Sequence, residues 1–299
     1  MRWSTFRSAE GDERVGVWHD GQLYAVPGNV SLVELIADDR LVEAAAQGRP
    51  VPDRDAVTLL PPIPRPPAIR DFMAFEEHVV TASAAIGLTV DPLWYSQPVF
   101  YFTNPASLLG ATSDVAIPPG SEALDYELEI AAVIGREGSD LSPAEAVDHI
   151  AGYILFCDWS ARDLQGAEMR LNLGPAKGKD FASSCGPWMV TPDELPPDAR
   201  MTASVNERPC SAGRLNSLYW SFGQMIAYAS RGTRVVPGDL IGSGTVGTGC
   251  LLELSRVHGS EAYPWLHAGD HVHLEADGLG SIDARVIPGP SPVPLRPDA

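Results

Sequence analysis

The stretch Leu124–Gly135 reads LDYELEIAAVIG and combines two different patterns. The acidic residues Asp125, Glu127 and Glu129 alternate with apolar ones, and the apolar run Ile130–Ile134 follows directly. Alternation with a period of two predicts a β-strand and places the three carboxylates on one face. Residues two apart in a strand lie about 7 Å apart, so at an effective dielectric constant of ~20 each neighbouring pair repels by roughly 2.5 kcal/mol. Two explanations are open: the face is solvated, or a cation lies against it.

Composition narrows the choice of partners. The chain has 299 residues, of which 44% are hydrophobic, enough for one large domain or two. With 39 acidic and 21 basic residues, its formal net charge is -18. Nucleic acid and anionic membrane surfaces are therefore unfavourable partners. An anionic small substrate is compatible with this charge if local cations or a metal reverse the field around it.

Cysteine usage and hydropathy indicate a compartment. The four cysteines are widely spaced and form no C-x-x-C pair, which favours free thiols over a disulfide scaffold or a zinc site. The N-terminal residues contain no apolar targeting core, and the longest largely apolar stretch, Leu218–Ala229, is too short to span a bilayer. We expect a cytoplasmic protein that does not enter membranes.

Lysine is almost absent from the chain. Only two of the 21 basic residues are lysines, and both, Lys177 and Lys179, lie in the segment GPAKGKDF. A lysine ammonium is a compact, titratable charge that can meet an oxyanion or move a proton, which an arginine does less readily. The segment is therefore a candidate for the functional site, although two lysines can also fall together by chance.

The first part of the chain carries clear local signals. Val15–Trp18 and Leu23–Val26 flank an Asp-Gly pair, which predicts a β-hairpin. Ser31 and Glu34 have the spacing of a capping box, and Gly48 marks the expected end of the helix that they open. These signals predict a small module with both strands and a helix.

The rest of the chain forms the larger unit. A proline-rich stretch between Pro50 and Pro67 cannot be helical and predicts an extended connector. We place a small N-terminal α+β module at residues 1–65 and a catalytic domain at residues 66–299. Short strands separated by Gly and Pro turns dominate that domain, and helices are expected at Phe72–Ile86, Ser142–Ile150, Ser160–Met169 and Ser217–Ser230. Strands and helices do not alternate regularly, which predicts an α+β, mainly β fold.

Other polar residues in apolar surroundings are candidates for the chemistry. If Asp71 caps a helix, His78 lies two turns later on the same side, which suits a metal-plus-base pair or, equally, a cap and a surface histidine. Asp158 follows the buried strand Tyr153–Cys157, where it would be functional or would cap a helix. Glu253 lies in CLLELS, which we interpret as an apolar strand, so it needs a polar partner such as a histidine.

Several familiar motifs give weaker signals. Gly242, Gly244 and Gly247 fit G-x-G-x-x-G, but the strand-like CLLELS follows them rather than a helix, so no dinucleotide site is expected. No G-x-S-x-G elbow is present. His271 and His273 alternate on a predicted strand, and we interpret them as ordinary strand residues.

Five segments, taken in order, resemble the fumarylacetoacetate hydrolase superfamily in its short bacterial form. They are RDFMAFEEHV, DYELEIAAVIG, DWSARDLQ, LGPAKGKDF and GSGT…LLELS, and the resemblance covers roughly residues 65–285. It implies a mixed β-sandwich roll, a homodimer and a divalent cation, Mg²⁺, Mn²⁺ or Ca²⁺. A cation would answer the opening question, because it turns the repulsion between the carboxylates into attraction.

The resemblance also implies roles for individual residues. It makes His78 the base that activates water, Glu253 the residue that orients it, and Lys179 the group that meets the developing oxyanion. It assigns the metal ligands as Asp71, Glu127, Glu129 and Asp158. It places in the substrate pocket Tyr101, Arg162, Gln165 and Thr245.

The implied reaction is hydrolysis of a carbon–carbon bond in a small anionic β-diketo acid. The segment after His78 has no arginine where the hydrolase proper binds the substrate carboxylate, and Met169 stands where a tyrosine is expected. Another acylpyruvate-like or β-diketone substrate is therefore at least as consistent as fumarylacetoacetate. A decarboxylase or tautomerase of oxaloacetate-like 2-oxo acids is the first alternative, and a catalytically silent dimeric binding protein is the second.

Overall fold

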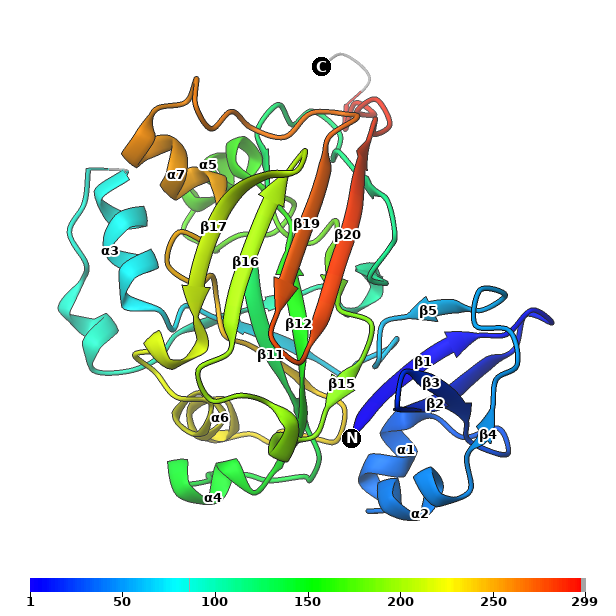
Figure 1. Ribbon diagram of the computed structural model, residues 1–299. Helices are drawn as coiled ribbons and strands as arrows, with labels where there is room; N and C mark the ends of the chain where they lie inside the picture. Colours follow the sequence, from blue (N-terminus) through cyan, green and yellow to red (C-terminus); the bar gives the residue numbers. More distant parts are fainter. Residues whose placement is uncertain (86, 297–299) are drawn as a thin grey trace.

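The computed structural model describes residues 1–85 and 87–296 and consists mainly of β-sheet (Figure 1). Within these residues, thirteen strands form one large mixed sheet whose main path runs β4-β3-β2-β1-β15-β12-β11-β18-β6-β7, with β5, β8 and β14 attached beside it. The strands are β1 (Arg2–Arg7), β2 (Glu13–His19), β3 (Gln22–Ala25), β4 (Arg49–Pro50), β5 (Thr58–Leu60), β6 (Ile69–Phe72), β7 (Phe100–Thr103), β8 (Leu108–Leu109), β11 (Leu128–Ile134), β12 (Ile150–Asp158), β14 (Ser183–Cys185), β15 (Met189–Val190) and β18 (Leu240–Gly242).

A second sheet packs over the first. It has the order β17-β16-β19-β20-β9 and lies in front of β11 and β12 in Figure 1. Its strands are β9 (Val115–Ala116), β16 (Arg200–Val205), β17 (Arg208–Arg214), β19 (His271–Ala276) and β20 (Gly280–Ile287). A two-stranded sheet joins β10 (Leu124–Asp125) to β13 (Ser160–Ala161). Two packed sheets with few helices confirm the predicted α+β, mainly β fold.

The helices are short and lie around the sheets. They are α1 (Leu32–Ala37), α2 (Leu41–Ala46), α3 (Glu76–Ala85), α4 (Pro143–Val147), α5 (Arg162–Met169), α6 (Phe222–Ser230) and α7 (Leu251–His258). The described part of the chain also contains the 3₁₀ turns η1 (Pro92–Tyr95), η2 (Pro105–Ser107), η3 (Pro192–Glu194) and η4 (Leu215–Ser217). Each of the four helices predicted for the main domain is present within narrower bounds, and Ile86 lies outside the described residues. Helices α3, α5 and α7 gather at one end of the molecule (Figure 1).

The local signals of the first part of the chain gave the expected elements. Strands β2 and β3 form the hairpin, with Asp20 and Gly21 at positive φ in the turn. Ser31 and Glu34 make the reciprocal bonds of a capping box. The helix expected to continue to Gly48 is instead divided into α1 and α2, because Asp39 adopts a φ of 55° between them.

The N-terminal strands join the main sheet. In β1, Arg2 and Trp3 pair with Val190 and Met189 of β15, so the large sheet continues from the first residues into the middle of the chain. The side chain of Trp3 is buried in one hydrophobic cluster with Ala131 and Val133 of β11. The hairpin, α1 and α2 form a lobe beside β15 (Figure 1).

Strand β11 occupies the centre of the fold because both of its faces are buried. Ile130, Ala132 and Ile134 pack in the core that contains the second sheet, while Ala131 and Val133 pack in the other core. Burial on both faces explains the continuous apolar run in the sequence. The single strand predicted from Leu124 onward is wrong in one respect, since Tyr126 and Glu127 separate β10 from β11.

Two further expectations about local structure are also wrong. Asp71 lies inside β6, between partners Gly242 on β18 and Tyr101 on β7, and caps no helix. Glu253 lies in the first turn of helix α7 and not in a strand. The first backbone N–H groups of α7 are bound by the Asp125 carboxylate, 126 residues earlier in the chain, so the signal for this helix is not local.

Candidate metal centre and neighbouring base

Five adjacent strands converge on a buried group of acids. The order β12-β11-β18-β6-β7 places Asp158 at the end of β12, Glu129 near the start of β11, and Asp71 in β6 opposite Tyr101 of β7. Gly242, at the end of β18, lies between the strands that carry Glu129 and Asp71. Residues distant in sequence are thus brought together by sheet order alone.

The four carboxylates expected to bind a cation are almost completely buried. The exposed fractions of Asp71, Glu127, Glu129 and Asp158 are 2%, 6%, 0% and 0%. The Tyr101 hydroxyl donates to Asp158 and lies 3.2 Å from Asp71 Oδ2, and the carboxyl groups of Asp71 and Glu129 are neighbours. Burial excludes the solvated face as the explanation for the alternating acids.

One of the two lysines belongs to this group. Lys179 is 4% exposed, and its Nζ lies 2.5 Å from Glu127 Oε2 and 2.6 Å from Asp158 Oδ2. Lys177 has a side chain that is 72% exposed and pairs with Asp180 at 2.8 Å, away from the acids. Lys179 therefore lies between two of the expected ligands, and a cation bound by both of them would require its ammonium to withdraw.

The electrostatics of the group differ from residue to residue. Burial, with the charge of neighbouring carboxylates, raises the pKa of Asp71 to about 7 and the pKa of Asp158 to about 6. The same causes raise the pKa of Glu129 well above its ordinary value. Burial opposes ionisation of Glu127 as well, but the charge of Lys179 and of a nearby guanidinium outweighs it and lowers the pKa of Glu127. Without a cation, the folded protein thus raises the pKa of three of these four acids above their ordinary values.

The oxygen atoms of the group fit a hard divalent cation. Asp71 Oδ1, Glu129 Oε1 and Asp158 Oδ1 are buried and have no hydrogen-bond partner. Buried acceptors without partners are costly, and an all-oxygen set is the one that Mg²⁺, Mn²⁺ and Ca²⁺ prefer. A Cβ at Gly242 would overlap the Asp71 carboxylate and crowd Glu129 Oε2, so glycine leaves room for both acids.

The negative charges of Asp125 and Glu127 are balanced by the guanidinium of Arg162. Arg162, on α5, donates from Nε to Asp125 Oδ2 at 2.8 Å, and its Nη2 lies 2.8 Å from Glu127 Oε1. Its Nη1 donates to Gln165 Oε1 at 3.1 Å. Asp125 also accepts from the backbone N–H of Leu251, at 2.7 Å. The acid that the resemblance left outside the metal ligands therefore ties the acidic strand to α5 and α7.

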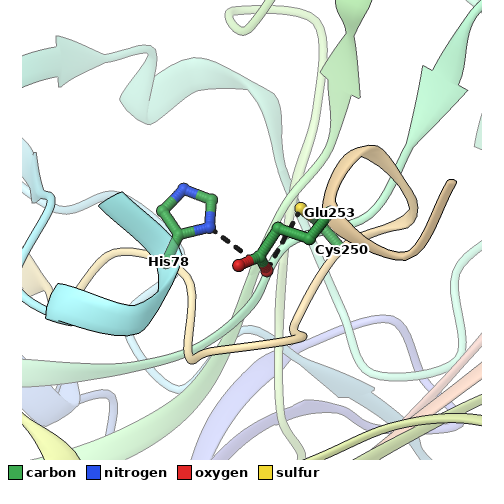
Figure 2. A group of neighbouring side chains, drawn as sticks. All are labelled: His78, Cys250 and Glu253. Carbon is green, nitrogen blue, oxygen red and sulfur yellow. Dashed lines mark hydrogen bonds and ion pairs between the residues drawn. The ribbon is translucent and has the colours of Figure 1, made fainter. Parts of the chain in front are cut away.

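A histidine and a glutamate face each other beside these acids. His78 Nδ1, on α3, lies 3.3 Å from Glu253 Oε2, on α7, and both side chains are at most 9% exposed (Figure 2). The proximity of His78 also lowers the pKa of Glu127. Cys250 was missed by the sequence reasoning, and its Sγ donates to Glu253 Oε2 at 3.6 Å. The three-residue spacing of Cys250 and Glu253 would have indicated this contact only if α7 had been predicted as a helix.

The glycine-rich segment before α7 supports the site rather than a nucleotide. A helix does follow it, contrary to expectation, but Gly244 has a φ of 75° and its N–H donates to Glu129 Oε2 at 3.0 Å. A Cβ at Gly247 would overlap the carboxylate of Glu77. Thr245, between these glycines, is buried at 2% exposure.

The fold and the site define a protein with a buried carboxylate centre at one edge of a mixed β-sheet, next to a histidine–glutamate pair. The chain belongs to the fumarylacetoacetate hydrolase family, because residues 68–287 match the family of the fumarylacetoacetate (FAA) hydrolase C-terminal domain. The resemblance noted in the sequence is thereby confirmed. This is an enzyme superfamily, and the relatives of the chain include a fumarylacetoacetase, an oxaloacetate tautomerase and a probable isomerase.

Two curated relatives illustrate that range. A fumarylacetoacetase of Arabidopsis thaliana is 28% identical over 270 residues, covering 67% of this chain, and the match spans less than two thirds (64%) of the plant enzyme. The mitochondrial oxaloacetate tautomerase FAHD2A of Homo sapiens is 30% identical over 251 residues, covering 82% of this chain and 74% of the human protein.

Solved structures confirm the fold. The fumarylacetoacetate hydrolase of Exiguobacterium antarcticum has a TM-score of 0.77 and 26% identity, covering 96% of this chain and 99% of that one. Maleylpyruvate hydrolase of Sphingobium sp. SYK-6, in complex with manganese(II) and pyruvate, shares the fold with a TM-score of 0.73 at 21% identity, covering 97% and 100% of the two chains. Among the helices of the described residues, none is long and apolar enough to cross a membrane.

Proposed function

We propose that this protein is a divalent-cation-dependent hydrolase that cleaves a carbon–carbon bond in a small anionic β-diketo acid of the acylpyruvate type. The observation that carries the proposal is the buried pair of His78 and Glu253 next to an all-oxygen carboxylate centre. The family membership and the relatives described as hydrolases support it.

The cation would be Mg²⁺ or Mn²⁺, or Ca²⁺, held by Asp71, Glu127, Glu129 and Asp158. When bound, such an ion supplies Lewis-acid polarisation and a template for the two oxygens of a dicarbonyl. The protein contributes a nearly water-free environment, since these side chains are at most 6% exposed. In such surroundings electrostatic interactions are much stronger than in water.

The orientation of the imidazole supports His78 as the base. His78 turns Nδ1 toward the Glu253 carboxylate at 3.3 Å, whose negative charge favours the proton on Nδ1 and leaves Nε2 to accept a proton from water. The water oxygen bonds to the distal carbonyl carbon as its proton passes to Nε2. The carbon–carbon bond then breaks, its electron pair forms an enolate, and a proton returns to carbon to give the ketone product.

The remaining polar residues of the site would bind the substrate and stabilise the enolate. The Lys179 ammonium, already drawn into the acidic group, would stabilise the enolate oxygen by hydrogen bonding. Tyr101, Gln165 and Thr245 would contact the substrate. Arg162 would do so from a guanidinium that also holds Asp125 and Glu127 in place. We further propose that the protein acts as a cytoplasmic homodimer.

A panel of acylpyruvates and related β-diketo acids tests the proposal directly. With Mn²⁺ or Mg²⁺, the enol absorbance should disappear and two acids, or an acid and a ketone, should form in equal amounts. His78→Gln should abolish this turnover, whereas His19→Gln, at a side chain that is 76% exposed, should leave it unchanged. If none of the panel is hydrolysed by the wild-type protein, the hydrolase proposal is wrong.

Tautomerisation of oxaloacetate-like acids is the second candidate, and the human relative favours it. Interconversion of enol and keto forms without release of carbon dioxide or hydrolysis would select this function. Release of carbon dioxide from oxaloacetate would select a decarboxylase. Dimerisation without any cation-dependent turnover would select a catalytically silent binding protein.

A further inference from the structure

We propose that His78, Cys250 and Glu253 form a second cation site, distinct from the carboxylate centre, which takes a borderline ion such as Zn²⁺ and blocks the base when it is filled. Binding of the ion does not depend on the proposed function. Only the inhibition rests on it.

The three side chains already have the spacing of ligands. One donor atom from each lies within 4.8 Å of the other two, with Nδ1 of His78 3.3 Å and Sγ of Cys250 3.6 Å from Oε2 of Glu253 (Figure 2). In a tetrahedral zinc site with bonds of about 2.0–2.3 Å, neighbouring ligand atoms lie about 3.3–3.8 Å apart. The two shorter separations fall in that range, so only small shifts are needed.

The site also has free coordinating capacity in a buried position. His78 Nδ1 and Glu253 Oε1 are buried and have no hydrogen-bond partner, and their side chains are 9% and 2% exposed. Cys250 is at 0% exposure. The 3.3 Å approach of His78 to Glu253 therefore leaves the imidazole nitrogen without a well-formed hydrogen bond, which a metal bond would replace.

The donor set separates this site from the carboxylate centre. Nitrogen, sulfur and one carboxylate oxygen are the ligands of Zn²⁺, whereas Mg²⁺ demands oxygen ligands and keeps several waters. The carboxylate centre thus prefers Mg²⁺ to Zn²⁺, and the group of His78, Cys250 and Glu253 prefers Zn²⁺ to Mg²⁺. Saturating Mg²⁺ should occupy the carboxylates and leave the His78, Cys250 and Glu253 group open to zinc.

Occupation of the site changes the protons on both sides of the imidazole. Cys250 loses its thiol proton to the buffer when Sγ bonds to the ion. The single proton of the neutral His78 imidazole moves from Nδ1 to Nε2 when Nδ1 bonds to the ion. A histidine in that state cannot accept a proton from water. Glu253 is bound to the ion as well, so the pair that would activate water is disabled.

Metal titration without substrate tests the site. The protein, saturated with Mg²⁺, is titrated with Zn²⁺ by calorimetry in two buffers of different ionisation enthalpy, and with Co²⁺ by absorption spectroscopy. We expect one tight site per chain, proton release on Zn²⁺ binding, and a thiolate-to-cobalt charge-transfer band in the near ultraviolet.

Variants assign the ligands. Cys250→Ser should abolish the cobalt band and weaken Zn²⁺ binding by at least about 100-fold. Removing a residue that only supports a metal ligand already lowers metal affinity by up to about 100-fold, so removing a ligand should cost at least as much. Cys185→Ser, at another cysteine of 0% exposure, should retain both. Retained Mn²⁺ binding by each variant serves as the check of folding. Absence of the cobalt band in the wild type, or equal Zn²⁺ affinity in Cys250→Ser, would overturn the site.

The outcomes for the two proposals are separable. If the zinc site is present, Zn²⁺ should inhibit any turnover found with acylpyruvates, and excess chelator followed by Mg²⁺ should restore it. If no substrate is found, the binding measurements still decide the zinc site. If zinc fails to bind, the zinc site is refuted, while the proposed Mg²⁺-dependent hydrolase activity can still be tested with the substrate panel.

Discussion

Replacing Asp125 tests how the acidic strand is joined to the helix that carries Glu253. The Asp125 carboxylate accepts hydrogen bonds from the backbone N–H of Leu251 at 2.7 Å and of Leu252 at 3.1 Å. It also accepts from Arg162 Nε at 2.8 Å, and Asp125 itself is at 0% exposure. Asp125→Ala leaves the first turn of α7 without an acceptor and leaves part of the buried charge of Arg162 without a partner.

The expected loss of stability follows from these contacts. Removing one partner of a buried ion pair costs about 3–5 kcal/mol, and removing a helix N-terminal acceptor costs about 0.5–2 kcal/mol. Arg162 keeps Glu127 at 2.8 Å, which reduces the first term to its lower end. We therefore expect Asp125→Ala to lower the free energy of unfolding by about 3–5 kcal/mol and Asp125→Asn, which retains one acceptor, by about 1–3 kcal/mol.

Guanidinium chloride unfolding of the wild type and both variants measures these differences. The matched control is Asp198→Asn, because Asp198 pairs with Arg214 at 3.3 Å with side chains that are 62% and 56% exposed. An exposed pair of this kind contributes at most about 1 kcal/mol. If Asp125→Asn destabilises the protein no more than Asp198→Asn does, the tie between the strand and α7 does not contribute as the contacts indicate.

Four other outcomes are expected. With the pKa of Asp71 at about 7 and of Asp158 at about 6, affinity for Mn²⁺ should rise as the pH increases through 6 and 7, because protons must leave first. The unfolding free energy of the cation-free protein should fall from about pH 4 to about pH 7, because the folded state holds those protons more tightly than the unfolded chain. Calorimetric titration measures the Mn²⁺ affinity and chemical unfolding measures the stability, each at several pH values. A Mn²⁺ affinity that does not vary with pH would contradict the first of these predictions. Gly242→Ala should weaken Mn²⁺ binding, since the added methyl group overlaps the Asp71 carboxylate and crowds that of Glu129, and unchanged affinity would mean that the two acids can separate freely. His78→Gln should keep the Mn²⁺ affinity of the wild type and lose about 10²–10⁴-fold in turnover, so equal loss of Mn²⁺ would show that His78 is a ligand.

Local sequence signals predicted the elements that are stabilised locally. The hairpin over β2 and β3 follows from its Asp-Gly turn, and the start of α1 follows from the pair Ser31 and Glu34. The alternating acids of the motif around β11 drew attention to the correct part of the chain. Such signals depend on neighbouring residues, and no tertiary contact is needed to interpret them.

The errors arise where distant parts of the chain decide the local structure. Helix α7 was interpreted as a strand because the acceptor for its first N–H groups is Asp125, 126 residues away. Asp71 was taken for a helix cap because its two strand partners, Gly242 and Tyr101, follow it by 171 and 30 positions in the sequence. The division of the acidic stretch into β10 and β11 likewise depends on pairing with β13 and β12.

The partners of the three alternating acids also could not be predicted from neighbouring residues in the sequence. Asp125 and Glu127 are balanced by Arg162 and Lys179, which no spacing rule connects to them. Glu129 has no positively charged partner among the ion pairs of the described residues; it accepts a hydrogen bond from the N–H of Gly244, and the neighbouring Asp71 carboxyl raises its pKa. It is this acid, rather than all three, that most needs a bound cation.

Anomalous diffraction from crystals grown in a buffer that contains Mn²⁺ and lacks Mg²⁺ would test the carboxylate centre most directly. The expected result is a single strong manganese peak bound by oxygens of Asp71, Glu127, Glu129 and Asp158, with the Lys179 ammonium moved away from Glu127 and Asp158. An anomalous map with no peak between those carboxylates, at manganese concentrations that saturate binding in solution, would contradict the proposal that this edge of the sheet is a metal centre.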